Sequence, residues 1–292
     1  MANNTVSAPK SAPKKSQGFT GIKSGFTVII LCWVLAECIY VFGAGHLSNF
    51  NNPGMPADAG FFASNFHFFC GQELDPAGIV GTVYKGGLIV PIIWSMLLTV
   101  LALAIERFFA IKTAYGKTAL AKFVAEIKKA LAAHDLDKAQ QLCDAQQGSV
   151  ANVVGATLKA YREAEADATL SKEQKVLAIQ KELEEATALE MPMLQENLPI
   201  IGTIVTLGTL TGLLGTVVGM IKSFSAMGTE GSADSSALSV GISEALVNTA
   251  SGIATGALAV ISYNYFTNKI DRLTFALDEV GFSIVSTFNA TH

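Results

Sequence analysis

The sequence predicts an all-α membrane protein with four transmembrane helices and a helical cytoplasmic domain. Half of the 292 residues are hydrophobic and 15% are charged, whereas soluble domains carry about 25% charged residues. Four apolar stretches are each long enough for a bilayer core, which takes about 20 helical residues. These predicted spans are residues 25–45, 86–107, 198–222 and 240–266.

The distribution of lysine and arginine predicts the orientation of the spans, because cationic residues favour the cytoplasmic side. Cations occur repeatedly in residues 1–24, 108–197 and 267–292, whereas loop 46–85 carries only Lys85 and link 223–239 carries none. We therefore expect both termini in the cytoplasm and the two poorly charged connections outside. The Pro-, Ser- and Lys-rich segment 1–24 is predicted to be a disordered basic tail.

The first span has an alternative interpretation as a cleaved signal peptide. Its basic flank is long, and its apolar run exceeds a usual signal core. Both features favour a permanent transmembrane helix at 25–45. The span also contains a carboxylate, Glu37, with no obvious cation near it.

The region 108–197 is predicted to be a helical cytoplasmic domain. Apolar residues at three/four spacing in "KTALAKFVAEIKKALAAHDLDKAQQLCDA" predict a helical hairpin that turns near 134–137. Ser171 followed by Gln174 is typical of a capping box, which begins a helix. We expect this helix to continue into the third span, with its prolines in "EMPMLQENLP" kinking it near the membrane surface.

The third span, "LGTLTGLLGTVVGMIKSF", contains glycines four residues apart. Small residues at this spacing let two membrane helices approach closely, and the fourth span offers a matching pair. The predicted helix-packing residues are Gly208, Gly212, Gly215, Gly219, Gly252 and Gly256.

Polar residues recur at helical spacing in the same two spans. In the fourth span, one predicted stripe consists of Glu244, Asn248, Ser251 and Thr255. An ionisable residue near a span is a functional candidate. Alternatively, each threonine bonds back to its own helix and Glu244 lies at the membrane interface. Two polar stripes predict a lined cavity, which several copies of the chain would have to surround. The candidate pore-lining residues are Thr209, Thr216, Glu244, Asn248, Thr249, Ser251 and Thr255.

Motifs of other functional classes are missing from the sequence. It has no Walker-type phosphate loop, Ser/His/Asp set or metal-ligand cluster, so we expect neither an enzyme nor a bound cofactor. No basic stripe with interleaved aromatic residues indicates nucleic-acid binding. The expected energy source is an ion gradient.

Two segments, "TGLLGTVVGMIKSF" and "GISEALVNTASGIATGALAVISYN", resemble the motifs of the ExbB, TolQ and MotA proton channel family, with ExbB the closest branch. The resemblance implies a homopentameric subunit of the bacterial inner membrane that uses the proton motive force. It implies an ExbD/TolR-type single-span partner inside the pore, and a TonB-like protein as a further partner. By position, Thr216 and Thr249 would face the partner's membrane aspartate, and Glu244 matches the motif glutamate.

The sequence departs from the family pattern in two places. Leu258 replaces a motif proline, and the first span with periplasmic loop 46–85 has no counterpart in the three-span pattern. Because the MotA branch has four spans, a flagellar or gliding stator is the alternative function. A non-conducting membrane scaffold, which would only pack against partners, is the alternative of a different class.

Overall fold

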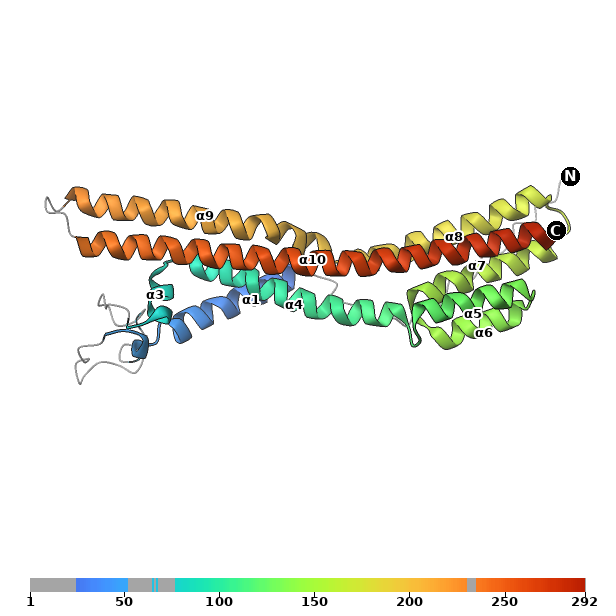
Figure 1. The fold of residues 1–292 in the computed structure, drawn as a ribbon, viewed down its shortest axis with the longest axis horizontal. Helices are drawn as coiled ribbons and strands as arrows, with labels where there is room; N and C mark the ends of the chain where they lie inside the picture. The colour runs from blue at the N-terminus through green and yellow to red at the C-terminus, as the bar shows by residue number, and fades with distance from the viewer. Residues whose placement is uncertain (1–24, 52–64, 66, 68–76, 230–234, 292) are drawn as a thin grey trace, which may run out of the picture. The chain divides into compact units, whose positions relative to one another are not determined.

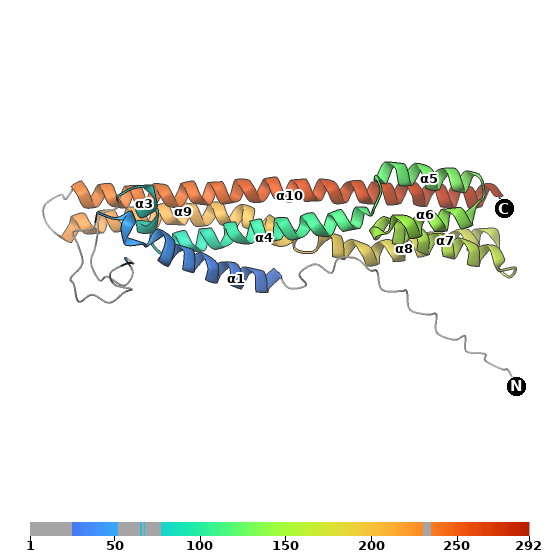
Figure 2. The ribbon, with the colours of Figure 1, turned by 90° about the horizontal axis from the view of Figure 1, so that it is seen from below.

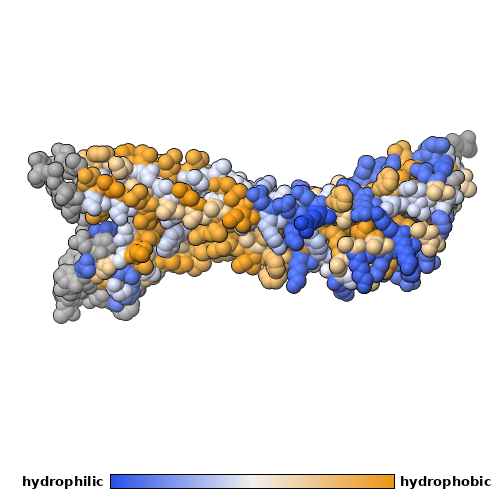
Figure 3. All heavy atoms as spheres, in the orientation of Figure 1, coloured by the Kyte–Doolittle hydropathy of each residue, from blue (hydrophilic) through white to orange (hydrophobic). Residues whose placement is uncertain are grey.

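The computed structural model describes residues 25–51, 65, 67, 77–229 and 235–291, and the regular elements in these residues are helices. They divide into two units. One, called here the apolar unit, comprises residues 25–109 and 195–271, and the other, the polar unit, comprises 110–194 and 272–291. Figure 3 shows apolar side chains prevailing on the surface of the first and polar side chains on that of the second.

The apolar unit contains the predicted spans. In the described residues, four helical stretches are long and apolar enough to cross a membrane. Figure 1 and Figure 2 both show α9 and α10 side by side. The helices of this unit are α1 (Gly25–Cys38) with its π-helical continuation η1 (Ile39–Ala44), the 3-10 turn η2 (Leu47–Asn49), α3 (Ile79–Lys85), the greater part of α4 (Ile89–Tyr115), α9 (Leu198–Thr229) and the first part of α10 (Ser235–Thr291).

Side chains from four helices form the core of the apolar unit. These buried side chains pack the four helices against one another. The outward faces of the helices are also apolar, as expected for contact with lipid or other protein chains. For example, Leu31 of α1 and Leu210 of α9 are 69% and 60% exposed. The core residues are Val28 and Cys32 of α1, Val100 and Leu103 of α4, Ile201 and Ile204 of α9, and Ala259 of α10.

The predicted continuous helix into the third span is interrupted, so that expectation was wrong. Helix α8 (Lys172–Gln195) contains Pro192 without ending there, and α9 begins at Leu198. Between them Asn197 has a φ of 64°, a left-handed conformation that does not continue an α-helix. Pro199 falls in the first turn of α9, where its missing N–H costs no hydrogen bond.

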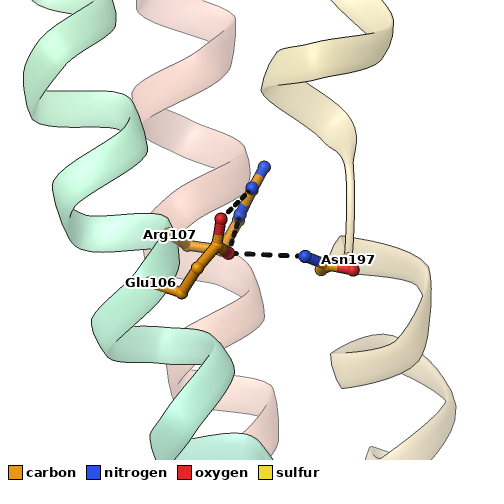
Figure 4. A network of polar contacts seen from close by, with 3 residues as sticks. All are labelled: Glu106, Arg107 and Asn197. Carbon is orange, nitrogen blue, oxygen red and sulfur yellow. Dashed lines mark hydrogen bonds and ion pairs between the residues drawn. The ribbon is translucent and has the colours of Figure 1, made fainter. Parts of the chain in front are cut away.

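The interruption contacts a buried ion pair on α4. The Arg107 guanidinium donates from Nε to Glu106 Oε2 at 2.6 Å, and Asn197 Nδ2 lies 3.4 Å from the same oxygen. Figure 4 shows the Arg107 and Asn197 side chains meeting at the Glu106 carboxylate. Arg107 is 1% exposed and Glu106 is 6% exposed, so the pair is shielded from solvent.

The polar unit confirms two local predictions. The hairpin is formed by α5 (Leu120–Ala132) and α6 (Leu136–Gln146), and His134 sits in its turn with a φ of 54°. At the start of α8, Ser171 N donates to Gln174 Oε1 at 2.9 Å and Gln174 N donates to Ser171 Oγ at 3.3 Å. These reciprocal bonds are the predicted capping box.

Helix α7 (Gly148–Ala166) and the end of α10 complete the polar unit. The last span was expected to end at residue 266, with a cytoplasmic tail after it. Helix α10 instead continues without interruption to Thr291. The missed signal is an apolar repeat at three/four spacing. Its buried members are Leu273, Leu277, Val280, Ile284 and Phe288.

Candidate pore-lining site on α9 and α10

The two motif helices touch through their backbones. A Cβ added to Gly212 would lie 3.0 Å from both Asn248 O and Gly252 Cα, and one added to Gly252 would lie 2.7 Å from Gly208 O and Gly212 Cα. The 2.7 Å distances are too short for a real Cβ, the 3.0 Å distances are unusually tight, and main-chain atoms cannot easily move aside. Glycine is therefore required at the closest approach of α9 and α10.

The contact extends along both helices as a continuous line, called here the glycine seam. Gly215 faces Asn248, Gly219 faces Ala245, and Gly256 faces Thr209. Every glycine that the sequence singled out for packing lies at this contact. The glycine seam consists of Gly208, Gly212, Gly215 and Gly219 of α9 with Gly252 and Gly256 of α10.

The candidate threonines use their hydroxyl protons within the chain. Thr249 Oγ1 donates across the seam to Gly212 O at 3.3 Å, whereas Thr216 donates to Leu213 O at 2.6 Å within its own helix. Thr209 likewise donates to Val205 O at 3.2 Å. Each hydroxyl oxygen keeps lone pairs, so these threonines can still accept a hydrogen bond.

The polar stripe of α10 is divided by burial in the described chain. Within the stripe, Glu244 and Ser251 are half-buried, and so are Thr249 beside the stripe and Thr216 of α9. Thr255 is 1% exposed and donates to Ser251 O, and Asn248 is 2% exposed and donates from Nδ2 to Gly86 O at 3.1 Å. Thr209 is exposed. Spacing correctly indicated a shared helix face for the stripe, but not which neighbours that face would meet.

An apolar surface surrounds Thr216. It lines a shallow hollow on α9 together with Val217, Met220, Ile221 and Phe224. Val217 is 51% exposed and Ile221 is 63% exposed. A hydroxyl in such a setting favours contact with lipid or with another protein segment, because its proton is already bonded to its own helix.

The threonines give the site the chemistry of a hydrogen-bonding lining. Threonine hydroxyls do not titrate near neutral pH, so a proton carrier would have to be supplied by another group. Within the described residues, no cluster of three or more His, Cys, Asp or Glu side chains is suited to a metal ion.

Comparison with known proteins gives consistent matches to one family. Residues 149–279 match the model of the MotA/TolQ/ExbB proton channel family. An ExbB-like protein 3 of Synechocystis, described as a biopolymer transport protein, is 40% identical over 97 residues, which are 32% of this chain and 46% of the relative. The matched region includes both motif helices and the glycine seam.

Two further relatives carry ExbB and TolQ names. The biopolymer transport protein ExbB of Helicobacter pylori is 40% identical over 81 residues, covering 28% of this chain and 56% of the relative. The Tol-Pal system protein TolQ of Pseudomonas aeruginosa is 35% identical over 88 residues, covering 30% and 38%. The chain thus spans about half the length of the curated relatives it matches. Residues 149–279 are therefore similar to the MotA/TolQ/ExbB proton channel family, and the relatives named here carry ExbB and TolQ names.

Proposed function

We propose that this chain is an ExbB-like motor subunit of the bacterial inner membrane. It uses the proton motive force, together with an ExbD/TolR-type partner, to energise transport or integrity at the outer membrane. The observation that carries the proposal is the α9–α10 pair, in which a tight glycine seam holds the two family motifs together. Half-buried Thr216 and Thr249 lie on these motifs.

The proposed assembly is a homopentamer around a central space. One chain offers two helices to such a wall, and α9 leaves apolar side chains such as Leu213 and Ile221 57% and 63% exposed. Neighbouring copies and the partner helices would cover these surfaces. Thr216 and Thr249 would face the central space. Glu244 and Ser251 would lie beside the ion pathway, and Thr209 would lie nearer its cytoplasmic end.

The threonine geometry suggests how the lining would act on a partner's acid. Because Thr216 and Thr249 donate their protons to Leu213 O and Gly212 O, their oxygens act as acceptors. A protonated carboxyl group can donate to such an acceptor, whereas a carboxylate cannot. The lining would therefore favour the acid while it carries its proton. Each proton that crosses a potential of 100 mV supplies about 2.3 kcal/mol.

The test replaces each pore threonine by valine, which has the same shape but no hydroxyl. Thr216→Val and Thr249→Val should each reduce proton-driven transport by about 2- to 10-fold, the effect of removing one hydrogen bond to a neutral group. Transport is measured in cells that depend on this protein and its partner. Native mass spectrometry of the extracted complex should still find five copies with bound partner.

Thr203→Val is the matched control. Thr203 is an exposed threonine of α9 that bonds back to Pro199 O at 2.8 Å, so its loss should leave transport unchanged. Normal transport in both pore variants would refute the proposed function and favour a non-conducting scaffold. A monomer without bound partner would refute the proposed assembly.

A further inference from the structure

The additional first helix ends in a π-helical turn that presents Tyr40. Helix α1 passes into η1 at Ile39, and π-helical turns frequently occur at functional sites. The Tyr40 side chain is buried, with its hydroxyl within hydrogen-bonding distance of two main-chain carbonyl oxygens, those of Tyr84 and Gly87. Its distance to Gly87 O is 3.1 Å. Tyr84 lies in the last turn of α3 and Gly87 in the connection to α4, and residues 84–90 are called here the α3–α4 turn.

Aromatic packing fixes the same contact. The Tyr40 ring stacks on Tyr84 with centroids 4.7 Å apart and planes 17° from parallel, and Phe50 meets Tyr84 edge-on at 5.7 Å. Leu47 and Val90 are buried in the same cluster. The end of the first helix is therefore attached firmly to the α3–α4 turn.

Asn248 of α10 also bonds to this turn. Its Nδ2 donates to Gly86 O at 3.1 Å, next to the Gly87 carbonyl that Tyr40 contacts. A Cβ on Gly86 would lie 3.2 Å from Asn248 Oδ1, and one on Gly215 would lie 2.4 Å from Asn248 Cβ. Gly87 has a φ of 73°, a conformation that favours glycine. The turn is thus held by both Tyr40 and Asn248.

The Asn248 side chain carries a buried oxygen that lacks a hydrogen-bond donor among the described residues, which suggests that its bond to Gly86 has a function. Its Oδ1 is buried and accepts no hydrogen bond from the described residues, and an unsatisfied buried acceptor is destabilising. An alanine at this position would avoid that cost. The chain instead keeps an amide whose one bond reaches the α3–α4 turn, between the proposed functional residues Glu244 and Thr249.

We propose that Tyr40 and Asn248 are positioning residues, which both hold the α3–α4 turn and so fix where Glu244 and Thr249 lie on α10. This inference rests on the proposed function, since it gives those two residues a role in ion passage. Neither Tyr40 nor Asn248 handles the ion itself. The additional helix thereby becomes part of the support of the pore-lining helix.

The experiment measures hydrogen exchange by mass spectrometry on the full-length complex extracted in detergent. Tyr40→Phe removes one hydroxyl and keeps the ring stack, and Asn248→Ala removes the amide. Each variant should speed exchange by about 2- to 10-fold, the range for one hydrogen bond, in peptides covering 84–90 and also 244–252. The double variant should show less than the product of the two effects, because both side chains act on one turn.

Tyr265→Phe is the matched control, since Tyr265 is a tyrosine of α10 that is 48% exposed. Its exchange should match the unaltered protein. Unchanged exchange at 244–252 in Tyr40→Phe, or a double variant equal to the product, would overturn the anchoring.

Transport separates the positioning role from a purely structural one. Asn248→Ala should lower proton-driven transport several-fold while the mass of the complex is unchanged. Full transport together with faster exchange would overturn the positioning role. If the two pore-threonine variants transport normally, the proposed function fails, and the exchange data still decide whether the anchor exists.

Discussion

Glu106 and Arg107 are adjacent charged residues that the apolar unit buries as a pair. Arg107 is 1% exposed, and the Glu106 carboxylate receives bonds from Arg107 and Asn197. A buried pair is costly to desolvate, and its net contribution to stability is small. Removing one partner has a much larger effect, because the other charge then stays buried without compensation.

Glu106→Ala should therefore lower the free energy of unfolding by about 3–5 kcal/mol. The measurement is denaturant unfolding of the purified protein in detergent. The double variant Glu106→Met with Arg107→Met should lose much less, because no isolated charge remains. Equal losses in the single and double variants would contradict this account.

At the scale of single residues, the sequence predicted local features better than long-range ones. The capping box of Ser171 and Gln174 needs only neighbours within three residues, so its pattern is visible in the chain. Asn248 is different, because its partner Gly86 is 162 positions away. Spacing places Asn248 on the polar stripe, but only tertiary packing shows that its amide points to the α3–α4 turn.

At the scale of elements, the glycine seam decides how α9 and α10 pack. Main-chain atoms of Gly208 and Gly212 lie so close to Gly252 that no side chain fits between them. Close approach of this kind lets membrane helices gain packing energy where lipid supplies no hydrophobic drive. The seam was visible in the sequence because four-residue spacing of glycine has one main structural use in a membrane span.

Gly252→Ala should destabilise the protein more than Gly202→Ala. The new methyl group at 252 would meet main-chain atoms at 2.7 Å, whereas at 202 the nearest atom is the Tyr263 ring at 3.2 Å, which can shift. We expect a loss of about 1–3 kcal/mol at 252, the usual range for overpacking, and less at 202. Thermal unfolding in detergent measures both. A larger effect at 202 would argue against backbone contact at the seam.

Two element boundaries were not predictable from propensity. The left-handed Asn197 separates α8 from α9, although the surrounding sequence is compatible with a helix. Asparagine tolerates this conformation better than most residues, and its amide gains a contact with buried Glu106. Apolar residues at helical spacing beyond residue 266 indicated the extension of α10 to Thr291. The charged residues in the same segment instead favoured the expectation of a cytoplasmic tail.

At the scale of the whole molecule, composition predicted the division into an apolar and a polar unit. The four apolar stretches all occur in helices long enough to cross a membrane. The assignment of both termini to the cytoplasm stays a prediction from the lysine and arginine distribution. Contacts within one chain do not define the number of copies in the proposed assembly. The surfaces that would meet other copies are exposed in the single chain, as at Val217.

The close contact between α9 and α10 bears on whether a single subunit conducts ions. Where Gly212 and Gly252 meet, main-chain atoms leave no gap for a water file between α9 and α10. In the proposed pentamer the ion path lies between copies, so a single copy should carry no ion current. Planar-bilayer recordings of the isolated chain should stay at baseline. Steady proton current from monomers would mean that ions pass through a subunit instead of between subunits.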